Sequence, residues 1–155
     1  MTNHIDDFDK TVTIFEDILR SLNYSYKSIN LNDDDINYIV CIPATGNLKK
    51  LDIIPVLMYL NIKDYSLTIL AGNIYRFKKG EDVNPFYKLV NSVNELIKSG
   101  TFTVNEKSNQ ILYLDSMYCG SDFKELSRNK IRLLIDSFID GLSVLLTSIA
   151  RMENK

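Results

Sequence analysis

Histidine is the side chain that most often serves as a general base, and this chain contains a single one, His4. His4 lies in the polar, acidic opening "MTNHIDDFDK", which we expect to be frayed. A general base must be held beside the group that it deprotonates. The sequence therefore disfavours Ser-His-Asp or Cys-His catalysis and a histidine-rich zinc site.

The two cysteines, Cys41 and Cys119, do not form a CxxC metal or redox motif. Cys41 lies in a predicted strand, where a small apolar core residue is the simplest interpretation. Cys119 precedes a predicted helix, and a helix N-terminus lowers the pKa of a nearby thiol, so an exposed, reactive thiol is the alternative there. No signal peptide is recognisable, and we expect two reduced thiols in a cytoplasmic protein.

Acidic side chains gather at two places. The run "NDDD" at residues 32–35 offers oxygen ligands, but the glycine and glutamate of an EF-hand are absent. Asp136 and Asp140 are one helical turn apart, and Arg132 is placed to neutralise Asp136. The segment "ATGNLKK" lacks the spacing of a phosphate-binding loop. We therefore expect no metal, no cofactor and no enzymatic activity.

Residues 130–152, "KIRLLIDSFIDGLSVLLTSIARM", form the longest apolar stretch that we single out. At 3.6 residues per turn, one face collects Ile131, Leu134, Ile135, Phe138, Leu142, Leu145 and Ile149. Asp136 and Asp140 would each cost a few kcal/mol in the centre of a bilayer. The pattern predicts an amphipathic helix packed on a sheet and no membrane span.

A separate strip of this helix combines small and apolar residues: Leu133, Ser137, Gly141, Val144 and Ser148. A glycine in mid-helix costs about 1 kcal/mol relative to alanine, and small residues let another backbone approach closely. Two interpretations remain open. The strip is close-packed or solvated within its own domain, or it contacts a second subunit or a client. We take these five residues as the candidate partner interface.

The elements that position these residues follow from periodicity and turn signals. A first helix has its apolar stripe between Ile14 and Leu22, ends near Asn23, and begins at Thr13, Asp7 or Asp9. Strands are expected at residues 24–30, 37–43, 51–60 and 65–72, followed by a loop at 73–83. The strands at 51–60 and 65–72 form a predicted hairpin, in which Pro55 favours an edge strand or a bulge.

The second half of the chain continues this pattern. Asn84 followed by Pro85 predicts a helix start, and Gly100 follows the helix as a stop signal. Two more strands are expected at residues 101–104 and 110–117, and Ser121 or Asp122 caps the final helix. The sequence thus predicts an α+β domain with an antiparallel sheet of five to six strands and three helices, in the order α-β-β-β-β-α-β-β-α. We expect one domain over residues 1–155, with an ordered core at roughly 8–152.

Composition narrows the function classes. The chain has 155 residues, 45% of them hydrophobic, and a formal net charge of -2. A nucleic-acid-binding domain needs a basic face to neutralise phosphates, so we expect no nucleic-acid partner. The nine tyrosines fall largely on or beside predicted strands, which leaves a tyrosine-lined pocket for a small molecule as an alternative function.

Three segments together resemble the YbjN-like family of bacterial sensory transduction regulators. They are "FEDILRSLNYSY" with a strand directly behind it, "NPFYKLVNSVNELIKSGTFTV" with Asn94 near the helix end, and "QILYLDSM" before the long final helix. The resemblance covers nearly the whole chain. It implies an architecture shared with type III secretion chaperones and a small cytoplasmic protein that binds proteins or regulates, often as a dimer.

The resulting hypothesis is a non-enzymatic protein-binding module, chaperone-like or regulatory, acting as a homodimer with a protein partner or client. The alternative is a small-molecule-binding domain that uses a tyrosine-rich sheet face.

Overall fold

A computed structural model describes residues 3–29 and 35–154. Its elements are α1 (Asn3–Ser21), β1 (Ser25–Ile29), β2 (Asp35–Pro43), the 3-10 helix η1 (Gly46–Leu51), β3 (Ile53–Asn61), β4 (Ser66–Arg76), α2 (Asn84–Asn94), β5 (Thr101–Asn105), β6 (Gln110–Tyr118), the 3-10 helix η2 (Ser121–Phe123) and α3 (Arg128–Glu153). This order confirms the predicted α+β class. The one-domain organisation of residues 1–155 stays a prediction.

The strands form one six-stranded sheet in the order β1-β2-β3-β4-β6-β5, and every neighbouring pair is antiparallel. β3 and β4 form the predicted hairpin. β4 continues into part of the segment predicted as a loop and ends at Arg76, because an irregularity between Ala71 and Tyr75 lets it regain pairing with β6. The loop prediction for residues 73–83 was therefore wrong for its first four residues.

Pro55 lies in a strand that is internal to the sheet, not in an edge strand. Residues 53–56 of β3, however, pair only with β2, because pairing with β4 begins at Leu57. Proline has no N–H to donate, and it is tolerated where one side of a strand is open. The local environment is that of an edge although the strand as a whole is not.

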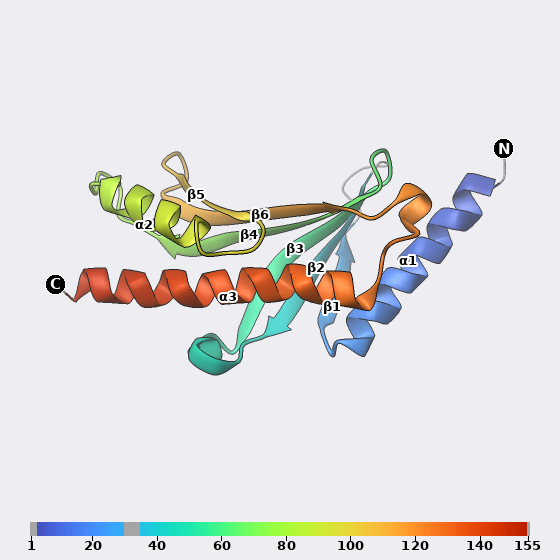
Figure 1. The fold of residues 1–155 in the computed structure, drawn as a ribbon, viewed down its shortest axis with the longest axis horizontal. Helices are drawn as coiled ribbons and strands as arrows, with labels where there is room; N and C mark the ends of the chain where they lie inside the picture. Colours follow the sequence, from blue (N-terminus) through green and yellow to red (C-terminus); the bar gives the residue numbers. More distant parts are fainter. Residues whose placement is uncertain (1–2, 30–34, 155) are drawn as a thin grey trace.

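All three α-helices cover the same face of the sheet (Figure 1). α1 packs on β2 through Phe15 and Tyr38, whose ring centroids are 5.0 Å apart. α3 crosses β6, where Phe138 and Tyr113 are 4.8 Å apart. α2 lies beside β5 and α3. Alternate residues of each strand therefore point into the core, and the others point to a face turned away from the helices.

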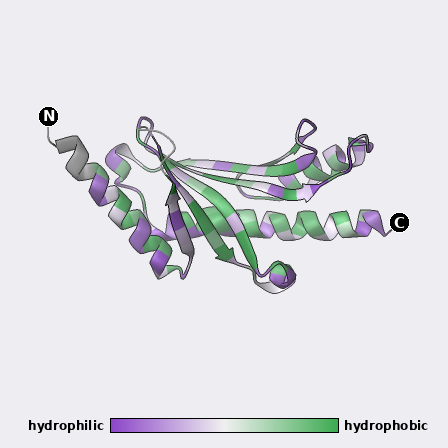
Figure 2. Cartoon of the chain, turned by 180° about the vertical axis from the view of Figure 1, so that it is seen from behind, coloured by the Kyte–Doolittle hydropathy of each residue, from purple (hydrophilic) through white to green (hydrophobic). Residues whose placement is uncertain are grey.

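The apolar face predicted for the final helix is confirmed, since Ile131, Leu134, Ile135, Phe138, Leu142, Leu145 and Ile149 are all buried. Figure 2 shows the hydrophobic residues running along α3 and the strands it faces. Within the described ranges, α3 is the one helix long and apolar enough to span a membrane by length and composition. Its buried apolar side chains pack against the sheet.

The predicted helix starts need correction. α3 begins at Arg128, where the Ser127 side chain accepts a hydrogen bond from the Lys130 N–H. Neither Ser121 nor Asp122 caps it, because both lie in η2, and the Asp122 φ of 54° is left-handed, whereas an N-cap residue is extended. α1 begins at Asn3, and the Thr13 hydroxyl bonds to the Asp9 carbonyl inside the helix.

Two smaller predictions also shift. Pro85 lies in the first turn of α2 as expected, but Asn84 is already helical and Val83 takes the cap position. In the acidic run at 32–35, residues 32–34 lie outside the described residues, and Asp35 begins β2.

Candidate functional site

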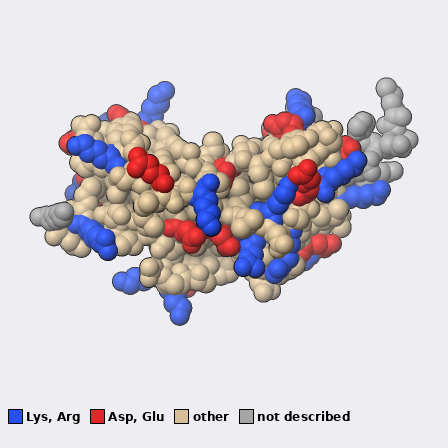
Figure 3. Space-filling view, viewed as in Figure 1, with Lys and Arg blue, Asp and Glu red and all other residues tan. Residues whose placement is uncertain are grey.

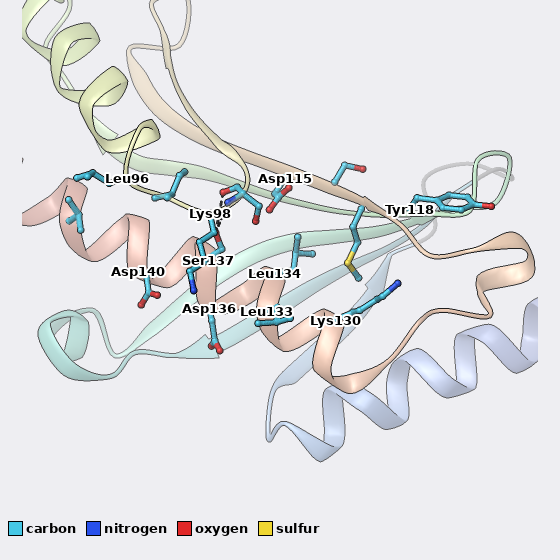
Figure 4. A pocket seen from close by; sticks show the side chains of 15 residues that line it. Leu96, Lys98, Asp115, Tyr118, Lys130, Leu133, Leu134, Asp136, Ser137 and Asp140 are labelled. Carbon is cyan, nitrogen blue, oxygen red and sulfur yellow. Dashed lines mark hydrogen bonds between the residues drawn. The ribbon is translucent and has the colours of Figure 1, made fainter.

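A groove of about 610 Å³ lies between α3, the connection from α2 to β5, and the last residues of β6. Its lining comes from α3 (Lys130, Leu133, Leu134, Asp136, Ser137, Asp140, Val144), from the connection (Leu96, Ile97, Lys98, Ser99) and from β6 (Asp115, Ser116, Met117, Tyr118). Figure 4 shows side chains from these three segments converging on one space. A volume of this size is typical of a binding site.

Hydrogen bonds fix one wall of the groove. The Ser99 N–H donates to the Ser137 Oγ at 3.2 Å, and the Ser137 hydroxyl donates back to the Ser99 carbonyl at 3.1 Å. The Tyr113 hydroxyl donates to the same carbonyl at 3.2 Å. Ser137 therefore holds the connection against α3, and Tyr113 holds it against β6.

Asn94 closes the connection from the other end. Its side-chain amide donates to the Phe102 carbonyl at 2.9 Å and accepts from the Phe102 N–H at 2.8 Å. These two bonds substitute for a missing neighbouring strand at the start of β5. The asparagine near the end of this helix, noted in the family resemblance, thus ties α2 to the sheet.

Gly141 of α3 packs against Ile97 of this connection and Phe102 of β5. A Cβ at this position would lie 2.8 Å from Ile97 Cγ2 and 2.8 Å from Phe102 Cε2, which is closer than packed carbon atoms allow. A larger residue would therefore force Ile97 and Phe102 to move. This side of the groove is closed and well packed.

The opposite side of the groove is open and apolar. The Leu133 side chain is 66% exposed although it lies one residue before the buried Leu134. Leu96, Tyr118 and Val144 are exposed around the same groove. Each exposed leucine keeps apolar surface in contact with water at a cost of about 25 cal/mol per Å², so covering this rim is favourable.

The charged residues of the groove differ in their pairing. Asp136 pairs with Arg132 at 3.5 Å, as the sequence predicted, and Lys130 pairs with Glu125.

Asp115 is only 9% exposed, and the Tyr113 hydroxyl reaches it at 3.4 Å. Burial, and secondly the Asp115 charge, raise the pKa of Tyr113 above its usual range. On the face shown in Figure 3, basic and acidic side chains are interspersed.

The structure divides the strip that was taken from the sequence. Leu133, Ser137 and Val144 line the groove, whereas Gly141 is packed within the domain. Ser148 is half-buried and lies beyond the groove lining. The close-packed interpretation therefore holds for Gly141, and the partner-contact interpretation of the strip stays a prediction. The contributions of Leu96 and of residues 115–118 were missed, because no local pattern reveals which loop meets α3.

The structure removes the alternative considered for Cys119 and corrects the prediction for Cys41. Cys119 is fully buried, and burial raises its thiol pKa, so it is not the exposed, activated thiol considered from the sequence. Cys41 is half-buried and belongs to the sheet face away from the helices, outside the core. Among the side chains that the structure describes, residues 8–29 and 35–154, no three His, Cys, Asp or Glu residues gather as a metal site would require.

The comparisons with known proteins add evidence on the fold. No family model and no curated protein sequence matches this chain, so the resemblance to the YbjN-like family stays a prediction. A solved chain from "Structure of the HopA1-SchA Chaperone-Effector Complex" is similar, with a TM-score of 0.51 and 13% sequence identity. The similarity covers 89% of this chain and 93% of that chain. The protein thus has a fold found in a chaperone–effector complex.

Proposed function

We propose that this protein is a non-enzymatic protein-binding module of the chaperone-like or regulatory type, and that the groove beside α3 holds its partner. The observation that carries the proposal is the exposed apolar rim formed by Leu96, Leu133 and Val144 around a groove of about 610 Å³. The fold shared with a chain of a chaperone–effector complex supports the same class. A cytoplasmic location is part of this proposal.

The chemistry of the groove lining supports a binding role. Its polar groups are carboxylates, lysine amines and hydroxyls. The Ser137 hydroxyl donates a hydrogen bond to the Ser99 carbonyl. A nucleophile needs an adjacent base, and the groove lining supplies no histidine or cysteine for such a pair. Apolar contacts with a few polar groups are the composition of a protein interface core.

A photocrosslinking experiment tests the partner role of the groove. A benzoylphenylalanine placed at Leu133 is expected to crosslink to a partner protein in cells, since that side chain is 66% exposed in the groove. The control is the same probe at Leu51, which is also exposed but lies in η1, outside the groove. Equal adducts at both positions, or none at Leu133, would contradict the proposal.

We also propose a homodimer, formed through the sheet face that the helices leave uncovered. Four aliphatic residues from neighbouring strands lie in one cross-strand row there: Ile39, Leu57, Leu70 and Leu114. Ile39 and Leu114 are exposed. Light scattering should give a dimer mass that Leu114→Lys lowers to a monomer mass while Leu133→Lys does not. A wild-type monomer would refute the dimer.

A second candidate function is the binding of a small molecule in the same groove, because its volume lies within the range of ligand pockets. The tyrosine-rich face is a poorer site than the sequence indicated, since Tyr38 and Tyr113 are fully buried and fill the core. A ligand that binds the native state must raise the melting temperature. A metabolite panel that produces no thermal shift would remove this candidate.

A further inference from the structure

Strand β6 is paired unequally along its length. β4 pairs with β6 as far as Tyr118, whereas β5 pairs only with residues 110–114. Thr101, the first residue of β5, lies opposite Leu114, and the chain before Thr101 turns away toward α2. Residues 115–118 of β6 therefore form a free strand edge. All four of these residues line the groove.

The hydrogen-bond pattern identifies the backbone groups that face this edge. The Cys119 N–H donates to the Tyr65 carbonyl at 2.8 Å, which makes these two residues a bonded pair of the β4–β6 ladder. Bonded pairs alternate along an antiparallel ladder, so Met117 and Asp115 also bond toward β4. The N–H and C=O groups of Ser116 and Tyr118 must then point to the free edge. An edge of this kind is a template for another strand.

Asp115 supplies a charge that an incoming strand can satisfy. Its side chain lies on the helix-facing side of β6, is 9% exposed and lines the groove. Among the described residues, no lysine or arginine forms an ion pair with it, and its hydrogen-bond partner is the Tyr113 hydroxyl at 3.4 Å. A buried carboxylate is stabilised when a cation reaches it.

We propose that an extended segment of the partner protein adds to β6 as a further strand, bonded to the N–H and C=O groups of Ser116 and Tyr118. This inference rests on the proposed function, in which the groove holds a protein partner. Strand addition to a sheet edge is an established mode of peptide recognition. The partner segment would fill the place next to β6 that β5 leaves empty.

The spacing along β6 also defines the sequence of the segment. Asp115 and Met117 are two residues apart, so both point toward α3, and side chains opposite them on the added strand are also two residues apart. The position facing Asp115 takes a lysine or arginine. The position facing Met117 takes an aliphatic side chain, which packs against Leu133 and Leu134. The recognised segment thus carries a basic and an aliphatic residue separated by one residue.

The test begins with a phage-displayed library of random nine-residue peptides, selected on the wild-type protein and synthesised for amide exchange measured by NMR. Selected peptides should carry the basic–x–aliphatic spacing in one direction or the other. Saturation with such a peptide should slow exchange at the Ser116 and Tyr118 amides by about tenfold or more. The Asp115 and Met117 amides, already bonded to β4, should change little.

Three variants sharpen the test. Ser116→Pro removes an edge N–H and should abolish peptide binding, whereas Ser116→Ala keeps the N–H and should preserve it. Asp115→Asn should weaken binding of the basic peptide by about tenfold or more, and it should remove the preference over a peptide with methionine in the basic position. If Ser116→Pro fails to fold, the amide exchange and the Asp115→Asn result decide.

The possible failures are distinguishable. Peptides that bind, that are blocked by Leu133→Asp, and that leave the Ser116 and Tyr118 amides unprotected would overturn strand addition while supporting the groove as a protein site. Peptides unaffected by Leu133→Asp, or no enrichment at all, would overturn both the strand addition and the proposed use of the groove.

Discussion

The two halves of β6 are built from the same kind of alternating sequence, yet they face different surroundings. Residues 110–114 lie between β4 and β5, and Tyr113 from this half is fully buried between Phe102 and Phe138. Residues 115–118 have β4 on one side and the groove on the other. On the side that faces the helices, the closed half contributes Ile111 and Tyr113 to the core, and the open half lines the groove.

The difference shows how one helix can serve both regions. On the closed side α3 carries Ser137 and Gly141, which let the α2–β5 connection approach closely. On the open side it carries Leu133 and Val144, which have no such neighbour and stay exposed. Small residues thus mark internal contact here, and exposed large ones mark the candidate interface.

The largest expected contrast is between two adjacent leucines of α3. Leu134→Ala should lower the free energy of unfolding by about 2–4 kcal/mol, because it leaves a cavity in the core. Leu133→Ala should change it by less than about 0.5 kcal/mol, because that side chain is in water. Urea unfolding of both variants measures the contrast, and equal losses would show that Leu133 is not on an open surface.

The next effect concerns the tie between α2 and β5. Asn94→Ala removes both hydrogen bonds to Phe102 and should lower the free energy of unfolding by about 2 kcal/mol, because two part-buried backbone groups lose their partners. Asn91→Ala, at an exposed position of the same helix, is the control. Equal stability of the two variants would contradict a structural role for the Asn94 side chain.

A smaller loss is expected at Gly141. Alanine gains about 1 kcal/mol of helix propensity but forces Ile97 and Phe102 to move, at a cost of about 1–3 kcal/mol. Gly141→Ala should therefore lower the free energy of unfolding by about 1 kcal/mol. Gly72→Ala, where the nearest atom to the new Cβ is 3.8 Å away, should be close to neutral. A stabilised Gly141→Ala would mean that α3 does not approach β5 closely.

The sequence was sufficient for the elements that depend on periodicity. Local patterns predicted the buried face of α3, the β3–β4 hairpin and an antiparallel sheet, and the structure confirms all three. The start of α3 did not follow, because Asp122 at capping-box spacing looks like a cap until its left-handed backbone is known. Spacing alone does not report the backbone angle.

The candidate site was predictable only in part. Leu133, Ser137 and Val144 were identified from their spacing on one helix strip. Which of them packs inside the domain and which stays exposed depends on where residues 95–100 cross α3. That crossing is a tertiary contact, and no local sequence pattern reveals it. The free edge of β6 depends likewise on tertiary structure. It arises because β5 is shorter than β6 and pairs only with residues 110–114, and the pattern of a single strand does not reveal how much of it is paired.

The smallest effect at neutral pH is expected for Tyr113→Phe, which removes the hydroxyl that is shared between the Ser99 carbonyl and the Asp115 carboxylate and should cost about 0.5–1.5 kcal/mol. At alkaline pH the two proteins should diverge. The pKa of Tyr113 is raised in the folded state, chiefly by burial, so its contribution is fully present below the unfolded value of about 10 and is lost as pH rises above it. The wild type should therefore lose stability more steeply than Tyr113→Phe between about pH 10 and 12, as measured by urea unfolding at each pH. Parallel losses would mean that Tyr113 ionises as readily in the folded protein as in the unfolded chain, which its place in the closed half does not allow.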